Sequence, residues 1–303
     1  MKYAFTTLAC PSWSIEQVVE AATTLGYDGV ELRLLDGAVI DPGADRAKVE
    51  QAVARCRAAG VEVCALDSSC TFNHANPGAR QREVSDLLRW IDLAEDLRVP
   101  LVRVFGGHAR PLWPTGPLPD PGVTDVTPGS GSRAPRGMGL APEPPEVVND
   151  WVIEALSRAA PTAEQAGVTV VLETHDAFSS ARRVAAVLDR VDSPRVAALW
   201  DSHHPYRTGE TAQDVIDALG PRIAHVHVKD ARRTTPDGSD WQLVLLGEGE
   251  VPVREQLQAL DRQGYSGYVS VEWEKKWHPA IAEPEIALPQ HIRWLRSGAD
   301  ARA

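Results

Sequence analysis

The chain has 303 residues, a formal net charge of -11 and a pI near 5.3. An acidic chain without a basic stripe is a poor ligand for nucleic acid, and the sequence has no run of about 18 apolar residues that would span a membrane. Its length suits one large α/β domain, and its four cysteines show no CxxC pair or disulfide-like spacing. We therefore expect a cytoplasmic protein with reduced thiols.

Eight short runs rich in β-branched residues recur along the chain, and each is followed by an amphipathic run. This alternation is typical of parallel strands that are buried on both faces. The strands are expected at 3–8, 29–34, 61–67, 101–105, 168–173, 196–201, 223–228 and 268–272. Eight such units predict an α/β fold, a single (β/α)8 TIM barrel over residues 1–303.

Signals for the start and end of helices lie between the strand-like runs. Ser14 stands before an amphipathic run as an N-cap, and Gly26 follows its last turn as a C-cap. Gly60, Gly167 and Gly264 stand in the same way at the end of later helical runs. A helix, a glycine and a short link into a strand form the connection expected at the N-terminal face of a barrel.

One segment, 106–145, interrupts this alternation after the fourth strand. It is dense in Pro, Gly and Ser and has no apolar periodicity, so it should form a long loop. Two interpretations are open, a flexible insertion or a lid over the face where the strand ends. In the second interpretation, Trp113, Arg133, Arg136 and Met138 close over a ligand.

Four of the later strand-like runs end on a side chain that can bind a metal. Glu173, Asp201 and Glu272 follow buried apolar runs, where an unpaired carboxylate is costly. His225 and His227 point the same way along the remaining run, and either could be the ligand, although His227 lies nearer the strand end. Since barrel strands aim their ends at one point, these residues favour one shared cation over separate structural salt bridges.

The four segments VVLETH, ALWDSHH, HVHVKD and SVEWE resemble motifs of the sugar phosphate isomerase/epimerase superfamily, the xylose isomerase-like TIM barrels. That superfamily includes D-tagatose 3-epimerase, inosose isomerases and dehydratases and, more distantly, endonuclease IV. The resemblance covers almost the whole chain outside 106–145. It implies one xylose isomerase-like domain whose metal ligands are Glu173, Asp201, His227 and Glu272.

Two further matches and two departures refine this resemblance. His204 and Arg233 stand where the ketose epimerases hold substrate oxygens. Ser179 stands where tagatose-type epimerases carry an acidic residue, which disfavours a free ketohexose as substrate. Endonuclease IV binds a trinuclear zinc cluster through ligands that this chain does not supply, and the acidic charge also disfavours DNA repair.

The oxygen-rich ligand set suits Mn²⁺ best, with Mg²⁺ and Co²⁺ as alternatives. A divalent cation polarises a carbonyl and stabilises the enediolate formed from it, and Glu173 and Glu272 are the candidate catalytic carboxylates that move the proton. The sequence therefore predicts a metal-dependent isomerase or epimerase. Its substrate would be a keto-sugar, a sugar phosphate or a cyclitol.

The same enediolate can expel a leaving group, so a lyase or dehydratase is the alternative. The reaction would be dehydration of an inosose or β-elimination from a 3-keto-glycoside. Several groups near the ligands could then act as acid or base: His175 is a candidate catalytic residue, and Lys229 and His278 are candidate substrate contacts.

Aromatic and early-strand residues supply further candidates for substrate binding. Trp277, with Trp200 and Trp273, could form an apolar wall or could pack in the barrel. Glu31 and the loop 68–74, which ends on His74, are weaker candidates because they lie at earlier strand ends. A third hypothesis is a barrel that binds a ligand without catalysis. A sugar or cyclitol is the expected ligand, and a homo-oligomer or a small partner subunit is left open.

Overall fold

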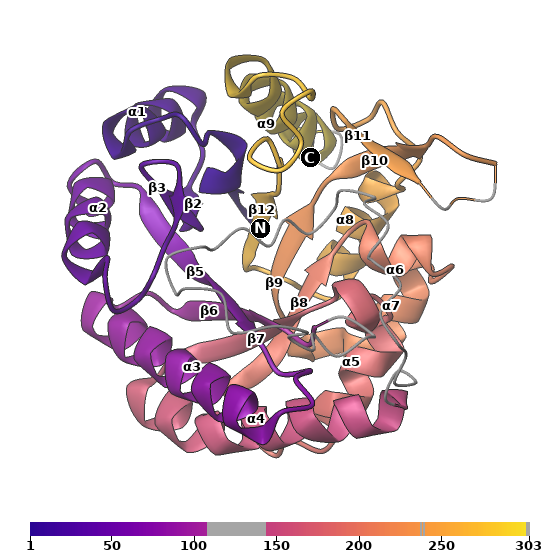
Figure 1. Cartoon of the computed structure of the whole chain (residues 1–303). Helices are drawn as coiled ribbons and strands as arrows, with labels where there is room; N and C mark the ends of the chain where they lie inside the picture. Colours follow the sequence, from indigo (N-terminus) through magenta and orange to yellow (C-terminus); the bar gives the residue numbers. More distant parts are fainter. Residues whose placement is uncertain (108–143, 237, 239, 301–303) are drawn as a thin grey trace.

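Eight parallel strands close into a barrel at the centre of the molecule, and helices surround it (Figure 1). The computed structural model describes residues 1–107, 144–236, 238 and 240–300. Around the barrel the strand order is β1, β12, β9, β8, β7, β6, β5 and β2, and every neighbouring pair is parallel. The predicted (β/α)8 barrel is therefore confirmed.

The barrel strands lie close to their predicted ranges. The main difference is β5, which runs on through residues 68–71, where we expected a loop; that prediction was wrong because the strand continues through a register shift against β6. The strands are β1 (Lys2–Thr6), β2 (Gly29–Leu32), β5 (Glu62–Thr71), β6 (Leu101–Phe105), β7 (Thr169–Glu173), β8 (Val196–Asp201), β9 (Ile223–Val228) and β12 (Tyr268–Val271).

Two short hairpins that the sequence did not predict follow the ends of barrel strands. The first pairs β3 (Leu34–Leu35) with β4 (Ala38–Val39), directly after β2. The second pairs β10 (Asp230–Arg233) with β11 (Trp241–Val244), directly after β9. In Figure 1 the second hairpin lies at the rim of the barrel. Both hairpins therefore belong to the face at which the barrel strands end.

One helix begins at its predicted signal, and four end at or within two residues of the predicted glycines. Ser14 and Gln17 form a reciprocal capping box, and Gly26 and Gly167 take the left-handed conformation after their helices. The helices are α1 (Ile15–Leu25), α2 (Arg46–Ala58), α3 (Pro77–Leu97), α4 (Pro145–Ala166), α5 (Ala181–Leu188), α6 (His204–Arg207), α7 (Ala212–Leu219), α8 (Val253–Arg262) and α9 (Pro284–Asp300), with short 3-10 turns η1 (Thr7–Ala9), η2 (Asp176–Phe178) and η3 (Gly220–Arg222).

The segment predicted as an insertion or lid, 106–145, falls mostly on residues 108–143, which lie outside the described residues. Trp113, Arg133, Arg136 and Met138 lie there too, so their closure over a ligand stays a prediction. The described chain leaves the barrel after β6 and returns at the start of α4. Both the lid and the flexible insertion remain open.

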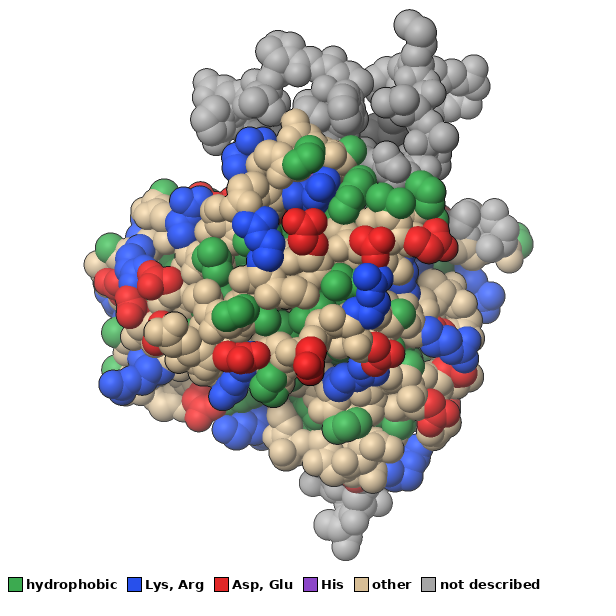
Figure 2. Space-filling view, turned by 90° about the horizontal axis from the view of Figure 1, so that it is seen from below, with side chains coloured by type: hydrophobic (Ala, Val, Ile, Leu, Met, Phe, Trp, Pro, Cys, Tyr) green, Lys and Arg blue, Asp and Glu red, His purple; other side chains and the backbone are tan. Residues whose placement is uncertain are grey.

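The described surface carries charges of both signs. On the face shown in Figure 2, Lys and Arg side chains are interspersed with Asp and Glu. Such a mixture lacks the continuous basic stripe that phosphate backbones need. Within the described residues, no helix is both long enough and apolar enough to cross a membrane.

The capping box at Ser14 gives a direct test of how the first barrel helix begins. Its hydroxyl accepts a hydrogen bond from the Gln17 backbone N–H at 3.4 Å, and the Gln17 side chain accepts one from the Ser14 N–H at 2.9 Å. Ser14→Ala should lower the free energy of unfolding by ~1 kcal/mol. Ser85→Ala, in the middle of α3, is the control and should be neutral or slightly stabilising. Equal effects in urea denaturation would contradict the cap.

Candidate metal centre

The pleat of the strands decides which side chains enter the barrel. Side chains two residues apart along a strand share a face. Inside the barrel, Val171, Ala197 and Leu199 form a small apolar layer of their own. Glu173 and Asp201 lie one further step along the same faces, so both carboxylates sit directly above this layer. The interior is thus apolar low in the barrel and charged near the strand ends.

Four side chains meet at this upper level. Glu173, Asp201, His227 and Glu272 each offer one ligand atom, and these atoms all lie within 4.8 Å of one another. Nδ1 of His227 lies 3.4 Å from Oε1 of Glu173 and 3.4 Å from Oε1 of Glu272. All four residues are buried. The structure therefore brings together the four residues that the sequence selected.

Several polar atoms of these four residues lack a hydrogen bond that a cation could replace. Both carboxylate oxygens of Glu173, Oδ2 of Asp201 and Nδ1 of His227 are buried and have no hydrogen-bond partner. Buried polar atoms are rarely left in this state, because each costs free energy unless a partner or an ion satisfies it. Three carboxylates and one imidazole form a donor set that suits a divalent cation with open coordination positions. This buried His, Glu and Asp cluster can therefore hold a metal ion.

Burial and the neighbouring charges both shift the pKa values of the site carboxylates. Burial raises the pKa of Asp201 to about 6, and the nearby carboxylates of Glu272 and Glu173 add to the rise against the opposing effect of Lys229. Burial also opposes ionisation of Glu173, but Arg103 and His227 outweigh it and hold the pKa of Glu173 below its ordinary value. The carboxylates thus compete for a limited supply of positive charge.

His227 is oriented from behind by a carboxylate of β2. Its Nε2 lies 2.9 Å from Oε1 of Glu31, and Nε2 of His225 lies 3.3 Å from the other oxygen of Glu31. When Nε2–H of His227 donates to Glu31, the lone pair of Nδ1 faces Glu173 and Glu272. His225, the alternative ligand, instead faces Glu31 and lies outside the four-residue cluster.

Glu31 lies behind a candidate metal ligand. We expected it as a weak candidate for substrate contact, but the side chain is fully buried behind His227. Burial and its two histidine neighbours act in opposite directions, and the histidines hold the pKa of Glu31 well below its usual range. Glu31 is therefore an anion that contacts a candidate metal ligand, and its contact with a substrate stays a prediction.

Arg103 and Asp67 form a second buried layer of charge that the sequence did not reveal. Nε of Arg103 lies 3.4 Å from Oε2 of Glu173, and its NH2 lies 3.7 Å from Oδ2 of Asp67. Burial, helped by the charge of Glu31, raises the pKa of Asp67 well above its usual range, against the opposing effect of Arg103. The signal was present, since Arg103 interrupts the apolar strand LVRVF.

Lys229 directly follows β9 and is buried beside the carboxylates of the site. Its ammonium nitrogen is 3.2 Å from Oδ2 of Asp201, 2.5 Å from Oε2 of Glu272 and 2.7 Å from Oε1 of Glu274. Burial acts against the charge, but these carboxylates raise the pKa of Lys229 well above its usual value. Glu274, which the sequence argument missed, also lies 3.4 Å from Nε2 of His278. Lys229 and His278 are thus linked to the site.

His175 and His204 lie beside the four-residue cluster and contact each other. Their ring centroids are 4.4 Å apart, and Nε2 of His204 lies 3.9 Å from Oδ1 of Asp201. Burial and the charge of Lys229 hold the pKa of His204 well below its usual value, so this imidazole is neutral. Burial opposes the charged form of His175, yet Asp176 and Glu173 raise its pKa.

Three other residues that we predicted as substrate contacts have partners outside the four-residue cluster. Arg233, on β10, pairs with Glu250 at 2.7 Å and is half exposed. His74 lies 3.4 Å from Glu83. Trp277 is partly buried beside Lys276 in the turn after the last barrel strand. The described residues show no contact between these three side chains and the four-residue cluster, so their roles stay predictions.

The two tryptophans that adjoin metal-ligand candidates in the sequence are both buried. Trp200 and Trp273 are at most 2% exposed and belong to the main hydrophobic core. They therefore pack in the main core of the barrel, as the second interpretation expected.

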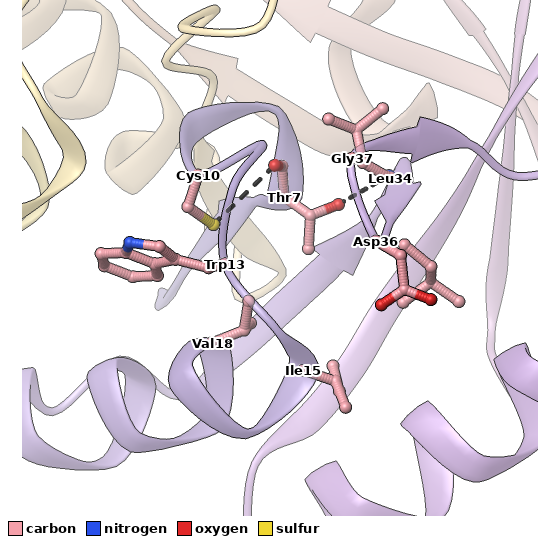
Figure 3. A pocket seen from close by; sticks show the side chains of 9 residues that line it. Thr7, Cys10, Trp13, Ile15, Val18, Leu34, Asp36 and Gly37 are labelled. Atoms are coloured by element: carbon pink, nitrogen blue, oxygen red, sulfur yellow. Dashed lines mark hydrogen bonds between the residues drawn. The ribbon is translucent and has the colours of Figure 1, made fainter.

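A small hollow beside η1 and the β3–β4 hairpin lies away from these residues. It measures about 10 Å³ and is lined by Thr7, Cys10, Trp13 and neighbouring residues (Figure 3). Thr7, which lines the hollow, is held by two hydrogen bonds. Its backbone carbonyl accepts one from Cys10 Sγ, and its hydroxyl accepts one from the Leu34 N–H. A cavity of this size holds roughly one water molecule, so it is no substrate site.

Curated proteins with similar sequences carry names from sugar chemistry. The chain is 32% identical over 159 residues to fructoselysine 3-epimerase of Escherichia coli O157:H7, which covers 51% of this chain and 55% of that protein. The protein of the same name from Shigella flexneri is 24% identical over 307 residues, 98% of each chain. Inosose dehydratase of Geobacillus thermodenitrificans is 30% identical over 161 residues, 48% of this chain and 53% of that protein. The first and third alignments thus span about half of the relative.

Solved structures share the fold over nearly the whole chain. The zinc-bound IOLI protein has a TM-score of 0.71 at 17% identity, with 99% of this chain and 96% of that chain covered. D-psicose 3-epimerase, solved in the presence of D-fructose, has a TM-score of 0.69 at 14% identity, with 99% and 97% covered. At identities this low, the similarity shows a shared fold alone.

The family described as xylose isomerase-like TIM barrel matches residues 19–298. Because this range takes in most of the barrel and all four converging side chains, the chain belongs to the xylose isomerase-like TIM barrel family.

Proposed function

We propose that this protein is a divalent-metal-dependent isomerase or epimerase that acts on a keto-sugar, a sugar phosphate or a cyclitol. One observation carries the proposal: Glu173, Asp201, His227 and Glu272 place four ligand atoms within 4.8 Å of one another at the ends of barrel strands. In barrels of this kind the loops at the strand ends form the catalytic face. The position of these four residues at the strand ends supports a catalytic site.

The cation would be held by these four side chains, with Mn²⁺ as the expected metal and Mg²⁺, Co²⁺ or Zn²⁺ as rivals. When bound, it supplies a Lewis acid for the carbonyl and hydroxyl oxygens of the substrate. A neutral His227 is needed at the same time. Burial opposes a charge on His227, but Glu31, Glu272 and Glu173 raise its pKa well above its usual value. A proton and a cation therefore compete for Nδ1.

Glu173 and Glu272 would move the proton. Each carboxylate places one oxygen 3.4 Å from Nδ1 of His227, where it could face the metal. The second oxygen of each contacts a cationic side chain and would exchange that contact for the substrate proton. One takes the proton from the carbon beside the carbonyl, and the other returns a proton to the opposite face, which inverts that carbon. Use of one face alone would give aldose–ketose isomerisation.

Cationic side chains hold the two bases in place. Arg103 contacts the second oxygen of Glu173 at 3.4 Å, and Lys229 contacts the second oxygen of Glu272 at 2.5 Å. Burial opposes ionisation of Glu272, but Lys229 and His227 hold its pKa well below the usual range. Both bases are therefore ionised before the substrate arrives. His204 lies beside Asp201, where it could contact a substrate oxygen.

The names of the similar proteins support an epimerase, and one of them supports a dehydratase as the alternative. Fructoselysine 3-epimerase and D-psicose 3-epimerase are epimerases by name, and inosose dehydratase is a lyase by name. The position of Lys229 favours the second reading, since an ammonium beside Glu272 could give a proton to a departing hydroxyl or alkoxide. A barrel that binds a ligand without catalysis is the outcome that shows neither reaction.

Metal binding tests the ligand set. We expect one divalent cation per chain in metal analysis after loading with Mn²⁺. Because the cation binds the folded protein, it should raise the Tm by roughly 5 °C at about 100 times its Kd. Asp201→Ala should abolish both effects. Asp150→Ala, which removes an exposed carboxylate paired with Arg190, is the control and should change neither. Full metal content in Asp201→Ala would contradict the assignment.

Glu31 should affect metal affinity without touching the metal. Glu31→Gln keeps the size of the side chain but removes the negative charge behind His227, so the Kd for Mn²⁺ should rise by about 10-fold to 100-fold. Glu62→Gln is the control, because Glu62 is exposed and pairs with Lys2 at the other end of the barrel. Calorimetric titration of both variants measures the difference. Equal Kd values would show that Glu31 does not orient the ligand.

Proton exchange tests the two bases. NMR in D₂O should show deuterium entering the carbon beside the carbonyl in at least one member of a panel of keto-sugars, inososes and oxidised glycosides, and a chelator should stop it. Glu173→Gln and Glu272→Gln should retain part of the metal and slow the exchange by ~10²-fold or more. Glu164→Gln, on the exposed face of α4, should exchange like the wild type.

The products of the same experiment separate the alternatives. An epimer or isomer of unchanged mass supports the first proposal, and an unsaturated product or a released aglycone supports the lyase. Wild-type exchange rates in both glutamine variants would show that neither carboxylate moves the proton. Absence of exchange across the whole panel with metal bound would leave only the non-catalytic barrel.

A further inference from the structure

A row of aromatic side chains runs outward from the metal centre. Each ring centroid in the row lies 4.4 to 5.9 Å from the next, within the usual range for aromatic pairs. We call this row the aromatic band. Its members, in spatial order, are Phe105, His175, His204, His203, Trp241 and Tyr206.

The inner part of the aromatic band belongs to the site already described. Phe105 ends β6, and His175 follows Glu173 by two residues. Nε2 of His204 lies 3.9 Å from Oδ1 of Asp201. A sugar held by the metal would therefore lie beside these rings. A single sugar ring covers only one or two side chains of this size, so the outer rings are left without a role in the proposed reaction.

The outer part of the aromatic band is built on two separate elements. Tyr206 lies on α6, and Trp241 begins β11 in the hairpin that follows β9. His203 joins the two parts, with its ring 5.7 Å from His204 and 5.0 Å from Trp241. Tyr206 and Trp241 are both only partly buried. The outer rings therefore leave part of their apolar surface open to solvent.

Trp241 has no polar atom left to offer. Its indole N–H donates to the Gly238 carbonyl at 2.9 Å. Arg233 lies directly opposite Trp241 in the hairpin, so both side chains share one face, and the guanidinium is 5.7 Å from the indole ring. Glu250 pairs with Arg233 at 2.7 Å and fixes it there. What remains for a ligand at Trp241 is the carbon surface of the ring.

The charges near the outer part argue against a cationic ligand. Arg233 stands beside Trp241, and Arg207, next to Tyr206 in the chain, is exposed. A positively charged group placed over Trp241 would meet the Arg233 guanidinium, which already lies 5.7 Å from the ring. A flat apolar group meets no such penalty and gains contact with the rings, since aromatic pairs add affinity beyond the area that they bury.

We infer that the substrate is a sugar that carries a flat apolar substituent, such as an aryl aglycone, and that Trp241 and Tyr206 hold this substituent. The inference rests on the proposed function, because the metal centre fixes where the sugar lies. The two barrel-wall tryptophans cannot take this role, since Trp200 and Trp273 are buried. Trp241 is thus a residue that determines specificity and takes no part in proton transfer.

The test compares three 3-keto-glucosides that share one sugar and differ only in the anomeric substituent: phenyl, methyl and 6-aminohexyl. Calorimetric titration uses the full-length chain loaded with Mn²⁺. The phenyl compound should bind about 3-fold to 10-fold more tightly than the methyl compound. The aminohexyl compound should gain nothing over methyl.

Variants assign the preference to Trp241. Trp241→Ala should bind the phenyl and methyl compounds equally and keep the wild-type metal content and methyl affinity, which shows that the hairpin and the centre are intact. Trp241→Phe should keep most of the preference. Trp151→Ala is the control, because it removes a partly buried tryptophan that stacks on Arg80 on the outside of the barrel.

Three results would overturn the inference: equal affinity for phenyl and methyl in the wild type, tighter binding of the aminohexyl compound, or an unchanged phenyl preference in Trp241→Ala. Failure to bind any of the three compounds would do so too. The deuterium-exchange experiment distinguishes failure of this inference from failure of the proposed function. Phenyl preference without exchange supports the aromatic site and contradicts the enzyme, whereas exchange without phenyl preference does the reverse.

Discussion

The main constraint on this barrel is the burial of several carboxylates close together. A buried carboxylate is tolerated only when positive charge or hydrogen bonds replace the water that it loses. Here Arg103 faces Glu173 from below, and Lys229 bridges Asp201 and Glu272 from above. Oxygens of Glu173 and Asp201 nevertheless remain without hydrogen bonds. The interior is organised around a positive charge that the described side chains do not supply.

Much of this arrangement could be predicted from the sequence because it follows from local rules. Strand runs and helix caps repeat often enough to indicate eight βα units, and the metal-competent residues at four of the strand ends mark the face on which the strands finish. The choice of His227 over His225 also follows from position, since side chains two residues apart share a face and the later one lies nearer the strand end.

Other features could not be predicted, because they depend on contacts between distant strands. Glu31 precedes His227 by 196 residues, and only closure of the barrel through β1 and β12 brings β2 near β9. Arg103 gave a signal as a charge inside an apolar strand, but its partner Glu173 lies on the next strand. Trp241 is similar, because its hairpin pairs after β9 and its ring contacts become visible only in three dimensions.

The charge balance also explains why one divalent cation suits this interior. Among the described residues, the carboxylates Glu31, Glu173, Asp201, Glu272 and Glu274 outnumber the buried cations Arg103 and Lys229 that contact them, even with His227 protonated. A divalent cation beside Glu173, Asp201 and Glu272 would offset this excess of negative charge. The reacting part of the substrate should therefore be an uncharged sugar. A phosphate at the metal would restore the excess of negative charge, so a phosphorylated substrate would have to carry that group away from the centre.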